Sequence, residues 1–313
     1  MGRHRNPLRQ ALVSAVAVVF FAIFRRLPLP VARRAGRLFG RVSLALLPRL
    51  HRVGRQNLDL AYGDRLSDAE KRRILRGAAE NMAIVAAEFP HLPRLASEDI
   101  GKFAQLEGVE LIDRKRGLLL IGAHLANWEW MGAILVRHGI RTAVVVRPLD
   151  APRLNTMVDA TRRACGVHTI GKDDAGVEMV RLLKEGWLVG VLIDQSPRDN
   201  AVPAKFLGAD CWATIAPVMI AVRAKVPVHP VSIVREADGT YTLRMLPALE
   251  LARTGDLRRD LIENTQRCQS AIEATVREHP ELWLWFHRRW KPRPRLAAEW
   301  QARLARDEKR RSS

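Results

Sequence analysis

The chain has 313 residues, of which 48% are hydrophobic, and its 52 Lys and Arg against 33 Asp and Glu give a formal net charge of +19. This apolar content excludes a disordered chain, a collagen-like repeat and a small disulfide-stapled domain. The positive charge predicts an acidic partner: nucleic acid, an anionic membrane or an acidic protein. Aromatic residues are only 6% and no RNP-type motif is present, so nucleic acid is not expected as the partner.

The three cysteines, Cys165, Cys211 and Cys268, are far apart and odd in number. None belongs to a C-x-x-C pair or to another spacing that binds a metal, so a reducing compartment is the simplest interpretation. None stands in a motif that contains histidine, which argues against a cysteine nucleophile. We interpret all three as small buried hydrophobic residues.

The first 50 residues combine apolar stretches with arginine. Residues 11–24 are apolar except for Ser14, but this run is shorter than the roughly 20 residues that a bilayer-spanning helix needs. Residues 31–50 mix apolar residues with arginine, as an interfacial amphipathic helix does. We therefore predict that residues 1–50 form a helical membrane anchor, monotopic or shallow, on the cytoplasmic face. A pair of ordinary buried helices is the alternative.

Residues 51–313 alternate between strand and helix patterns, which predicts an α/β domain with a mixed, largely parallel sheet flanked by helices. Ser67 and Glu70 form a capping box at the start of a helical lead-in over residues 66–97. Strands are expected over 117–123, 142–146, 167–170, 188–193, 228–234 and 240–245, the last two as a hairpin. Helices are expected over 127–137, 152–164, 174–185, 214–224 and 257–279. Residues 194–213 are expected to be a loop, and residues 295–313 a basic tail.

His124 directly follows the apolar run at 117–123, which places it at the carboxyl end of a buried strand, where ligand sites of α/β sheets lie. If it lies in the loop before the next helix, its ring can fold back toward Glu129. That carboxylate would fix the imidazole tautomer and leave the other nitrogen as a general base. The alternative is an isolated histidine beside an ordinary helix-start acid. No second histidine follows at i+4, so the spacing does not predict zinc.

The sequence HLANWE at residues 124–129 resembles the H-x4-D/E motif of glycerolipid-type acyltransferases, and its H-x-x-N-W-E form resembles the lipid A late acyltransferases. Further blocks resemble this family in the same order. They are Arg55 to Leu58, Arg147 to Asp150, Arg162 with Arg163, Asp194 with Gln195, Trp212 to Thr214, and Trp283 to Pro294. The chain departs from the family at Ala151, where asparagine is usual. The resemblance covers about residues 10–294.

The resemblance implies an enzyme that moves a fatty acyl chain from acyl carrier protein to a hydroxyl of a lipid A precursor, with no covalent intermediate, no metal and no other cofactor. It implies His124 as general base and Glu129 as its orienting partner. Roles in substrate or oxyanion binding are expected for Asn127, Arg147, Arg162, Arg163 and Asp194. The expected partners are acyl carrier protein, the acceptor glycolipid and an anionic membrane surface, and the expected location is the cytoplasmic side of the inner membrane.

Two other functions stay open. The chain could acylate another glycolipid or a lysophospholipid, for example a phosphatidylinositol mannoside. It could also be a non-enzymatic basic protein that binds membranes, which would leave His124 and Glu129 unexplained. The sequence does not give the acyl-chain length, nor which of Arg162 and Arg163 faces the site. The tryptophans of residues 283–290 are interpreted as packing and membrane-interface residues.

Overall fold

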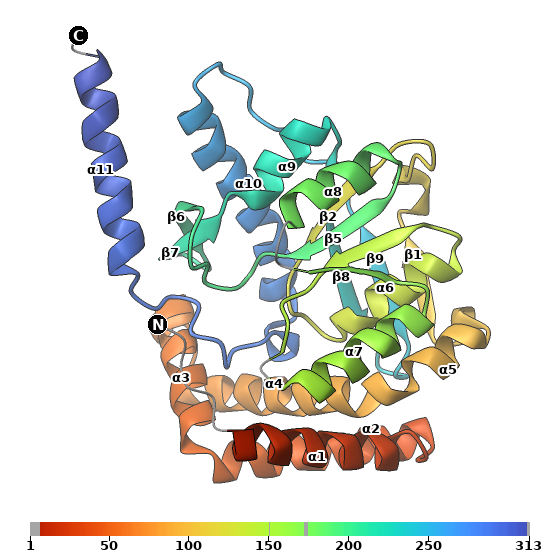
Figure 1. The fold of residues 1–313 in the computed structure, drawn as a ribbon. Helices are drawn as coiled ribbons and strands as arrows, with labels where there is room; N and C mark the ends of the chain where they lie inside the picture. The colour runs from red at the N-terminus through yellow and green to blue at the C-terminus, as the bar shows by residue number, and fades with distance from the viewer. Residues whose placement is uncertain (1–6, 150, 172–174, 312–313) are drawn as a thin grey trace.

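The structure is a computed structural model that describes residues 7–149, 151–171 and 175–311. Of the stretches named above, residues 1–6, Asp150, residue 174 and residues 312–313 lie outside the described residues. Within this description, seven strands form one sheet in the order β1-β9-β8-β2-β5-β3-β4 (Figure 1). Neighbouring strands run parallel except β8 and β9. The strands are β1 (Ala104–Glu107), β2 (Leu118–Gly122), β3 (Thr142–Val145), β4 (His168–Ile170), β5 (Leu188–Leu192), β8 (Val228–Arg235) and β9 (Tyr241–Met245). The predicted mixed, largely parallel sheet is confirmed.

The central strand β2 is buried along its whole length. Alternate side chains enter two hydrophobic cores, one on each face of the sheet, because successive residues of a strand point to opposite sides. Leu119 and Ile121 belong to one core, and Leu118 and Leu120 to the other. Helices α8 (Ala175–Lys184), α9 (Ala216–Ala224) and α10 (Leu257–Glu278) cover the first face, and α6 (Trp128–Arg137) with α7 (Pro152–Ala164) cover the second (Figure 1).

The elements predicted between residues 117 and 279 are present, with ends shifted by a residue or two. The capping box is also confirmed: Ser67 accepts a hydrogen bond from the Glu70 amide and the Glu70 carboxylate accepts one from the Ser67 amide, at the start of α4 (Asp68–Glu88). After α4 the lead-in continues as a short 3-10 turn and α5 (Leu92–Ser97).

Two regions differ from the prediction. Residues 194–213 are not all loop, because β6 (Ala201–Phe206) and β7 (Ala209–Thr214) form a two-stranded antiparallel hairpin. Because β6 contains small residues and Pro203, its sequence shows no clear alternation of apolar and polar residues. The hairpin is stabilised by contacts with α10. The amide of Lys205 donates to Gln266 on α10 at 2.7 Å, and the Phe206 ring is fully buried. Strand β1, which pairs with the sheet edge at β9, was also missed.

Three helices precede α4: α1 (Pro7–Phe24), α2 (Leu29–Leu46) and α3 (Pro48–Tyr62). Helix α2 lies along α4 (Figure 1), and glycines allow the close approach. A Cβ atom on Gly40 would lie 2.3 Å from the carbonyl oxygen of Ala79 on α4. One face of α2 therefore packs against the lead-in helix α4, while α1 contacts α7. Over the residues that the structure describes, no helix is both long and apolar enough to cross a bilayer.

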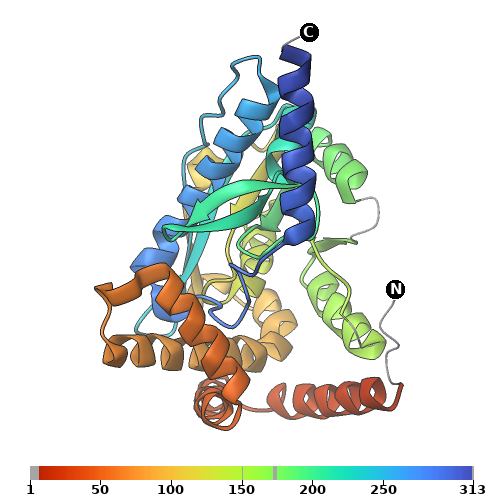
Figure 2. The ribbon, with the colours of Figure 1, turned by 90° about the vertical axis from the view of Figure 1, so that its left-hand side faces the viewer.

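At the other end of the chain, α11 (Pro294–Arg311) stands away from the sheet in Figure 1, and it lies at the front of the molecule in Figure 2. The segment that leads to it, residues 283–293, runs back past the carboxyl end of β2. Leu125 forms an isolated antiparallel bridge with Trp283. This contact brings the C-terminal block of the sequence next to His124.

Candidate active site

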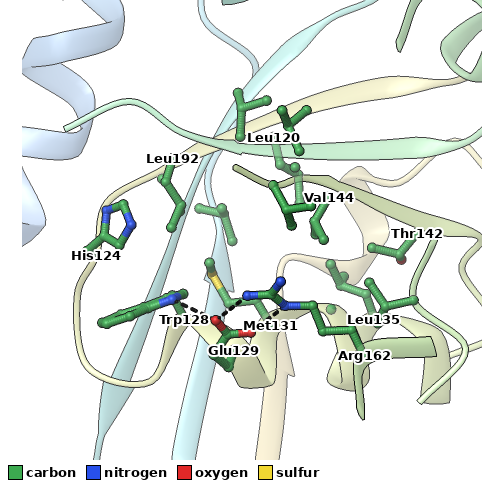
Figure 3. Close-up of a pocket in the computed structure, with 18 of the residues that line it drawn as sticks. Leu120, His124, Trp128, Glu129, Met131, Leu135, Thr142, Val144, Arg162 and Leu192 are labelled. Carbon is green, nitrogen blue, oxygen red and sulfur yellow. Dashed lines mark hydrogen bonds and ion pairs between the residues drawn. The ribbon is translucent and has the colours of Figure 1, made fainter. Parts of the chain in front are cut away.

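A pocket lies between the sheet and α6, on the face where Leu120 points (Figure 3). It has a volume of about 540 Å³. It extends from the carboxyl ends of β2 and β5 to Thr142 and Leu188, where β3 and β5 begin. The inner walls are mainly aliphatic. Apart from Thr142, the polar side chains gather toward the carboxyl ends of the strands, and they are His124, Glu129, Arg147, Arg162 and Gln195. An apolar pocket with a few converging polar groups is the usual form of a small-molecule site.

His124 is held by a buried aspartate. Its ring Nδ1 lies 2.7 Å from Oδ1 of Asp194, and its backbone N–H donates to Oδ2 at 2.9 Å. The indole N–H of Trp283 donates to the same Oδ2 at 2.8 Å. Because a carboxylate only accepts hydrogen bonds, Nδ1 carries the proton, and Nε2 keeps its lone pair when the ring is neutral. Nε2 lies 3.4 Å from the side-chain nitrogen of Gln195, which lines the pocket.

Burial and charge have opposite effects on the pKa values of Asp194 and His124. Burial alone would raise the pKa of Asp194, but the charge of His124 and the hydrogen bonds from His124 and Trp283 lower it to about 2. Burial alone would lower the pKa of His124, but the charge of Asp194, its hydrogen bond and the charge of Glu129 raise it above the ordinary 6.5. Asp194 is therefore a carboxylate across the neutral pH range, and it favours the protonated imidazole.

Glu129 does not contact the His124 ring, so the predicted hydrogen-bonded pair of these two residues is wrong. Its carboxylate accepts two hydrogen bonds from Arg162, at 2.8 and 2.9 Å, and one from the Trp128 indole at 3.1 Å (Figure 3). The reason is local: the loop before α6 directs the imidazole to the end of β5, whereas the first turn of α6 directs Glu129 toward α7. Both side chains still line one pocket, and a catalytic role for Glu129 stays a prediction.

The other predicted residues separate into two groups. Arg147 and Arg162 line the pocket, and the side chain of Arg162 is 18% exposed. Arg163 is exposed on α7 and is not among the lining residues. Asn127 is fully buried outside the pocket, and its amide donates to Glu88 at 2.5 Å. The structure therefore does not bring Asn127 into the pocket, because Glu88 on α4 binds its side chain at the start of α6. Its predicted role in substrate or oxyanion binding stays a prediction.

The loop that carries His124 is held in an uncommon conformation. Ala126 has a φ of +44°, a region that non-glycine residues rarely occupy. Its N–H donates to the carbonyl of Leu282 at 3.0 Å, and Asn81 on α4 donates to the carbonyls of both Ala126 and Leu282. The amide of Leu284 donates to the His124 carbonyl at 3.2 Å. The C-terminal segment thus fixes the loop from outside the sheet.

Sequence reasoning missed Asn81 and Trp283 as supports of the site. Asn81 stands in the lead-in helix with no motif around it, so no signal could have found it. Trp283 belongs to a block rich in His and Arg, which is unusual for simple packing, and this was the available signal. Trp283 is packed in the core, as predicted, and its indole has a further role because it also donates to Asp194. His287 accepts a hydrogen bond from the Ser196 amide, and burial lowers its pKa to about 4.

The cysteines are buried, as predicted. Burial raises the pKa of Cys165 to about 11 and that of Cys268 to about 12, so both thiols are protonated at neutral pH. None of the three lines the pocket. Their side chains are packing groups, and the histidine–aspartate pair is the chemical centre of the pocket.

A buried strand thus delivers an aspartate-bound histidine to an apolar pocket, which is an arrangement suited to general-base catalysis. The sequence model of the bacterial lipid A biosynthesis acyltransferase family matches residues 2–292. The chain therefore belongs to this family and is an acyltransferase.

Individual relatives are distant. The lipid A biosynthesis lauroyltransferase of Escherichia coli (strain K12) is 26% identical over 276 residues, which are 86% of this chain and 88% of that one. The lipid A biosynthesis palmitoleoyltransferase of the same organism is 24% identical over 278 residues, again 86% and 88%. A crystal structure of the 1-acyl-sn-glycerophosphate acyltransferase from Thermotoga maritima is similar with a TM-score of 0.35 and 17% identity, over 79% of this chain and 98% of that chain.

Proposed function

We propose that the enzyme transfers a fatty acyl chain from acyl carrier protein to a hydroxyl of a lipid A precursor, with His124 as the general base. The observation that carries this proposal is the orientation of the imidazole. Asp194 holds Nδ1, and the opposite nitrogen is left at the polar end of an apolar pocket. A hydroxyl is a poor nucleophile at neutral pH, so its attack on a thioester needs such a base.

In the proposed reaction, Nε2 of His124 takes the hydroxyl proton while the hydroxyl oxygen bonds to the thioester carbon. Asp194 stabilises the imidazolium that forms. The carbonyl oxygen becomes an oxyanion, and the amide of Gln195, beside Nε2, is placed to donate to it. The carbon–sulfur bond then breaks and the imidazolium returns the proton to the departing thiolate. The acyl chain never bonds to the enzyme.

The acyl chain is proposed to lie in the aliphatic part of the pocket. From Leu192 back to Leu188 the pocket follows β5 over about 13 Å, at about 3.3 Å per residue. A zigzag carbon chain advances about 1.25 Å per carbon, given carbon–carbon bonds of about 1.5 Å, so roughly ten carbons fit this length. Gly190 lies midway and lines the pocket with no side chain, which leaves the path open.

The test of this function is an assay of the purified protein with acyl carrier protein thioesters of graded chain length and a lipid A precursor. We expect mass spectrometry to detect an acceptor that gains one acyl group, with donors of roughly ten carbons, the length that fits the pocket, used best. Transfer only to another glycolipid or to a lysophospholipid would replace the acceptor in the proposal. Binding of the acceptor without transfer to any hydroxyl would contradict the proposal.

A Gly190→Leu variant tests the proposed path of the acyl chain in the same assay. The glycine has space beside it, because an added Cβ would meet its nearest neighbour, Val144, at 3.7 Å. A leucine side chain would enter the middle of the pocket, so the longest accepted donor should become shorter. An unchanged donor preference would place the acyl chain elsewhere.

We also propose that α2 docks on the cytoplasmic leaflet of the inner membrane. The support is its outward face, where apolar side chains are exposed between arginines. Leu38 is 61% exposed, Phe39 60% and Leu46 72%. Its opposite face packs on α4, with Arg33 paired to the buried Glu88. Interfacial helices combine these two features: apolar residues that enter the headgroup region and cations that attract anionic lipids.

Changing Leu38, Phe39 and Leu46 together to serine should release the protein from anionic vesicles. Each large apolar side chain contributes about 1.5–3 kcal/mol when fully buried, so vesicle binding should fall at least ten-fold while the packed face of α2 is unchanged. Co-sedimentation with phosphatidylglycerol vesicles measures this. The matched control changes Val177 and Leu257, two exposed apolar residues on α8 and α10. Undiminished sedimentation of the α2 variant would refute this docking surface.

A further inference from the structure

A group of cations surrounds Lys291 near the polar end of the pocket. Arg288 and Lys291 line one surface hollow, and Arg293 is hydrogen-bonded to Ser196, the neighbour of Gln195. The charges of Arg147, Arg198, Arg288 and Arg293 act on Lys291, and together the five form what we call the basic cluster. They come from three separate parts of the chain. Arg147 follows β3 and lines the catalytic pocket, and Arg198 lies in the loop after Asp194. The other three belong to the C-terminal block, so the fold, and not local sequence, gathers them.

The C-terminal part of the cluster is fixed to the loop after Asp194. Arg293 donates to the Ser196 hydroxyl at 3.0 Å and to the Ser196 carbonyl at 2.8 Å. Between these cations, Arg289 is fully buried and donates to the Trp212 carbonyl at 2.6 Å and to Gln269 at 2.8 Å. The segment that carries Lys291 is therefore anchored on both sides. The cations are held close to Gln195, the neighbour of His124.

The cluster lacks balancing acids among the described side chains. The structure gives Arg147, Arg198, Arg288 and Lys291 no hydrogen bond or ion pair to an acidic side chain that it describes. Asp199, beside Arg198 in sequence, is exposed. Lys291 is half-buried, and burial, with the repulsion of the surrounding guanidinium groups, lowers its pKa. Arg147, Arg198 and Arg288 are exposed, so solvent screens part of the repulsion, and an anion bound between the five cations would relieve the rest.

We propose that the basic cluster binds a phosphate ester of a substrate. Guanidinium forks match phosphate oxygens in pairs and a lysine ammonium adds a point charge, so this set of side chains suits a phosphate group. The site lies beside the catalytic pocket, and the inference rests on the proposed function. Two substrates can supply the group: an acceptor glycolipid with a sugar phosphate, and the phosphodiester of the carrier's pantetheine arm.

The kinetic test compares Lys291→Met, which keeps an apolar stem but removes the charge, with the wild-type enzyme. We expect the KM for one substrate to rise about ten-fold with kcat changed less than about two-fold, because a remote binding contact is lost equally in the ground and transition states. The ratio of the KM of Lys291→Met to that of the wild type should fall to about one when that substrate is replaced by its phosphate-free form. The phosphate-free forms are the dephosphorylated acceptor and an acyl-pantetheine donor. Arg223→Gln, on the surface of α9, is the charge-matched control.

The source of the phosphate is the substrate whose phosphate-free form abolishes the KM difference between Lys291→Met and the wild type. A KM increase that persists with both phosphate-free substrates would overturn the proposal, as would an unchanged KM in Lys291→Met. A second measurement separates this site from the proposed reaction: calorimetric titration of the full chain with glucose 1-phosphate, and with glucose as the neutral control. Binding of glucose 1-phosphate but not of glucose, with an affinity about ten-fold weaker in Lys291→Met, would support the site even if no acyl transfer occurs. No binding by the wild type would overturn it.

Discussion

Replacing His124 by alanine is expected to lower kcat/KM for acyl transfer by about 10²–10⁴-fold, the usual contribution of a positioned general base. The ring is 19% exposed, its Nδ1 is bound to Asp194 and its Nε2 faces the pocket. No other histidine lines the pocket within the described residues, so no neighbouring imidazole can substitute for it. The measurement is initial rate against donor concentration at saturating acceptor.

The alanine variant leaves Asp194 without its imidazole partner, so a second variant protects the conclusion. In His124→Asn the side-chain amide can donate to Asp194 roughly where Nδ1 did, but it lacks the second ring nitrogen. This variant should fold as the wild type does and be as inactive as the alanine variant. His168→Ala is the matched control, because His168 pairs with Glu178 outside the pocket. Wild-type turnover in His124→Asn would exclude His124 as the base.

Local patterns were sufficient to predict most of the fold. Five consecutive apolar residues form β2, which is buried on both faces, and the Ser67 capping box starts α4 where expected. These signals lie within a few residues of the element that they specify. The β6–β7 hairpin was missed because its stability depends on α10, which is more than 50 residues away in sequence. A short strand with Pro203 and small side chains carries no strong pattern of its own.

In the candidate site, too, local features could be predicted and contacts between distant residues could not. His124 and its position at a strand end could be read directly from the sequence, but the sequence could not tell whether Arg162 or Arg163 lines the pocket. The partner of the imidazole could not be predicted either, because two carboxylates were available and the choice depends on how the loop turns. Ala126, with its positive φ, sets that turn, and contacts from Asn81 and Leu282 hold it. These contacts join residues up to 201 positions apart, which no local pattern records.

Changing Asp194 to asparagine is expected to reduce turnover by as much as about 10⁴-fold, the scale seen when an aspartate that orients a catalytic histidine loses its charge. The amide keeps nearly the same shape but cannot stabilise the imidazolium. It can also present a donor to Nδ1, which then favours the tautomer protonated at Nε2, the wrong nitrogen for a base. The Trp283 indole, which donates to Oδ2 at 2.8 Å, keeps the side chain in place.

The pH profile distinguishes Asp194 from Glu129 as the group that sets the imidazole pKa. A general base works only when it is neutral, so wild-type kcat/KM should fall as pH drops through the raised pKa of His124, above 6.5. In Asp194→Asn the burial that lowers this pKa is no longer opposed by the adjacent charge. The acidic limb of the residual activity should therefore move to lower pH, even though the plateau is lower.

Glu129→Gln is the matched comparison, because it removes one negative charge from the same pocket without touching the ring. Its carboxylate acts on His124 only through its charge, as the last of the influences that raise the pKa. The limb should therefore shift less than in Asp194→Asn, although Arg162 loses its partner and the rate can fall for that reason. A larger shift in Glu129→Gln would mean that Glu129 moves to the imidazole when substrate binds. The histidine–glutamate pair expected from the sequence would then be the catalytic one.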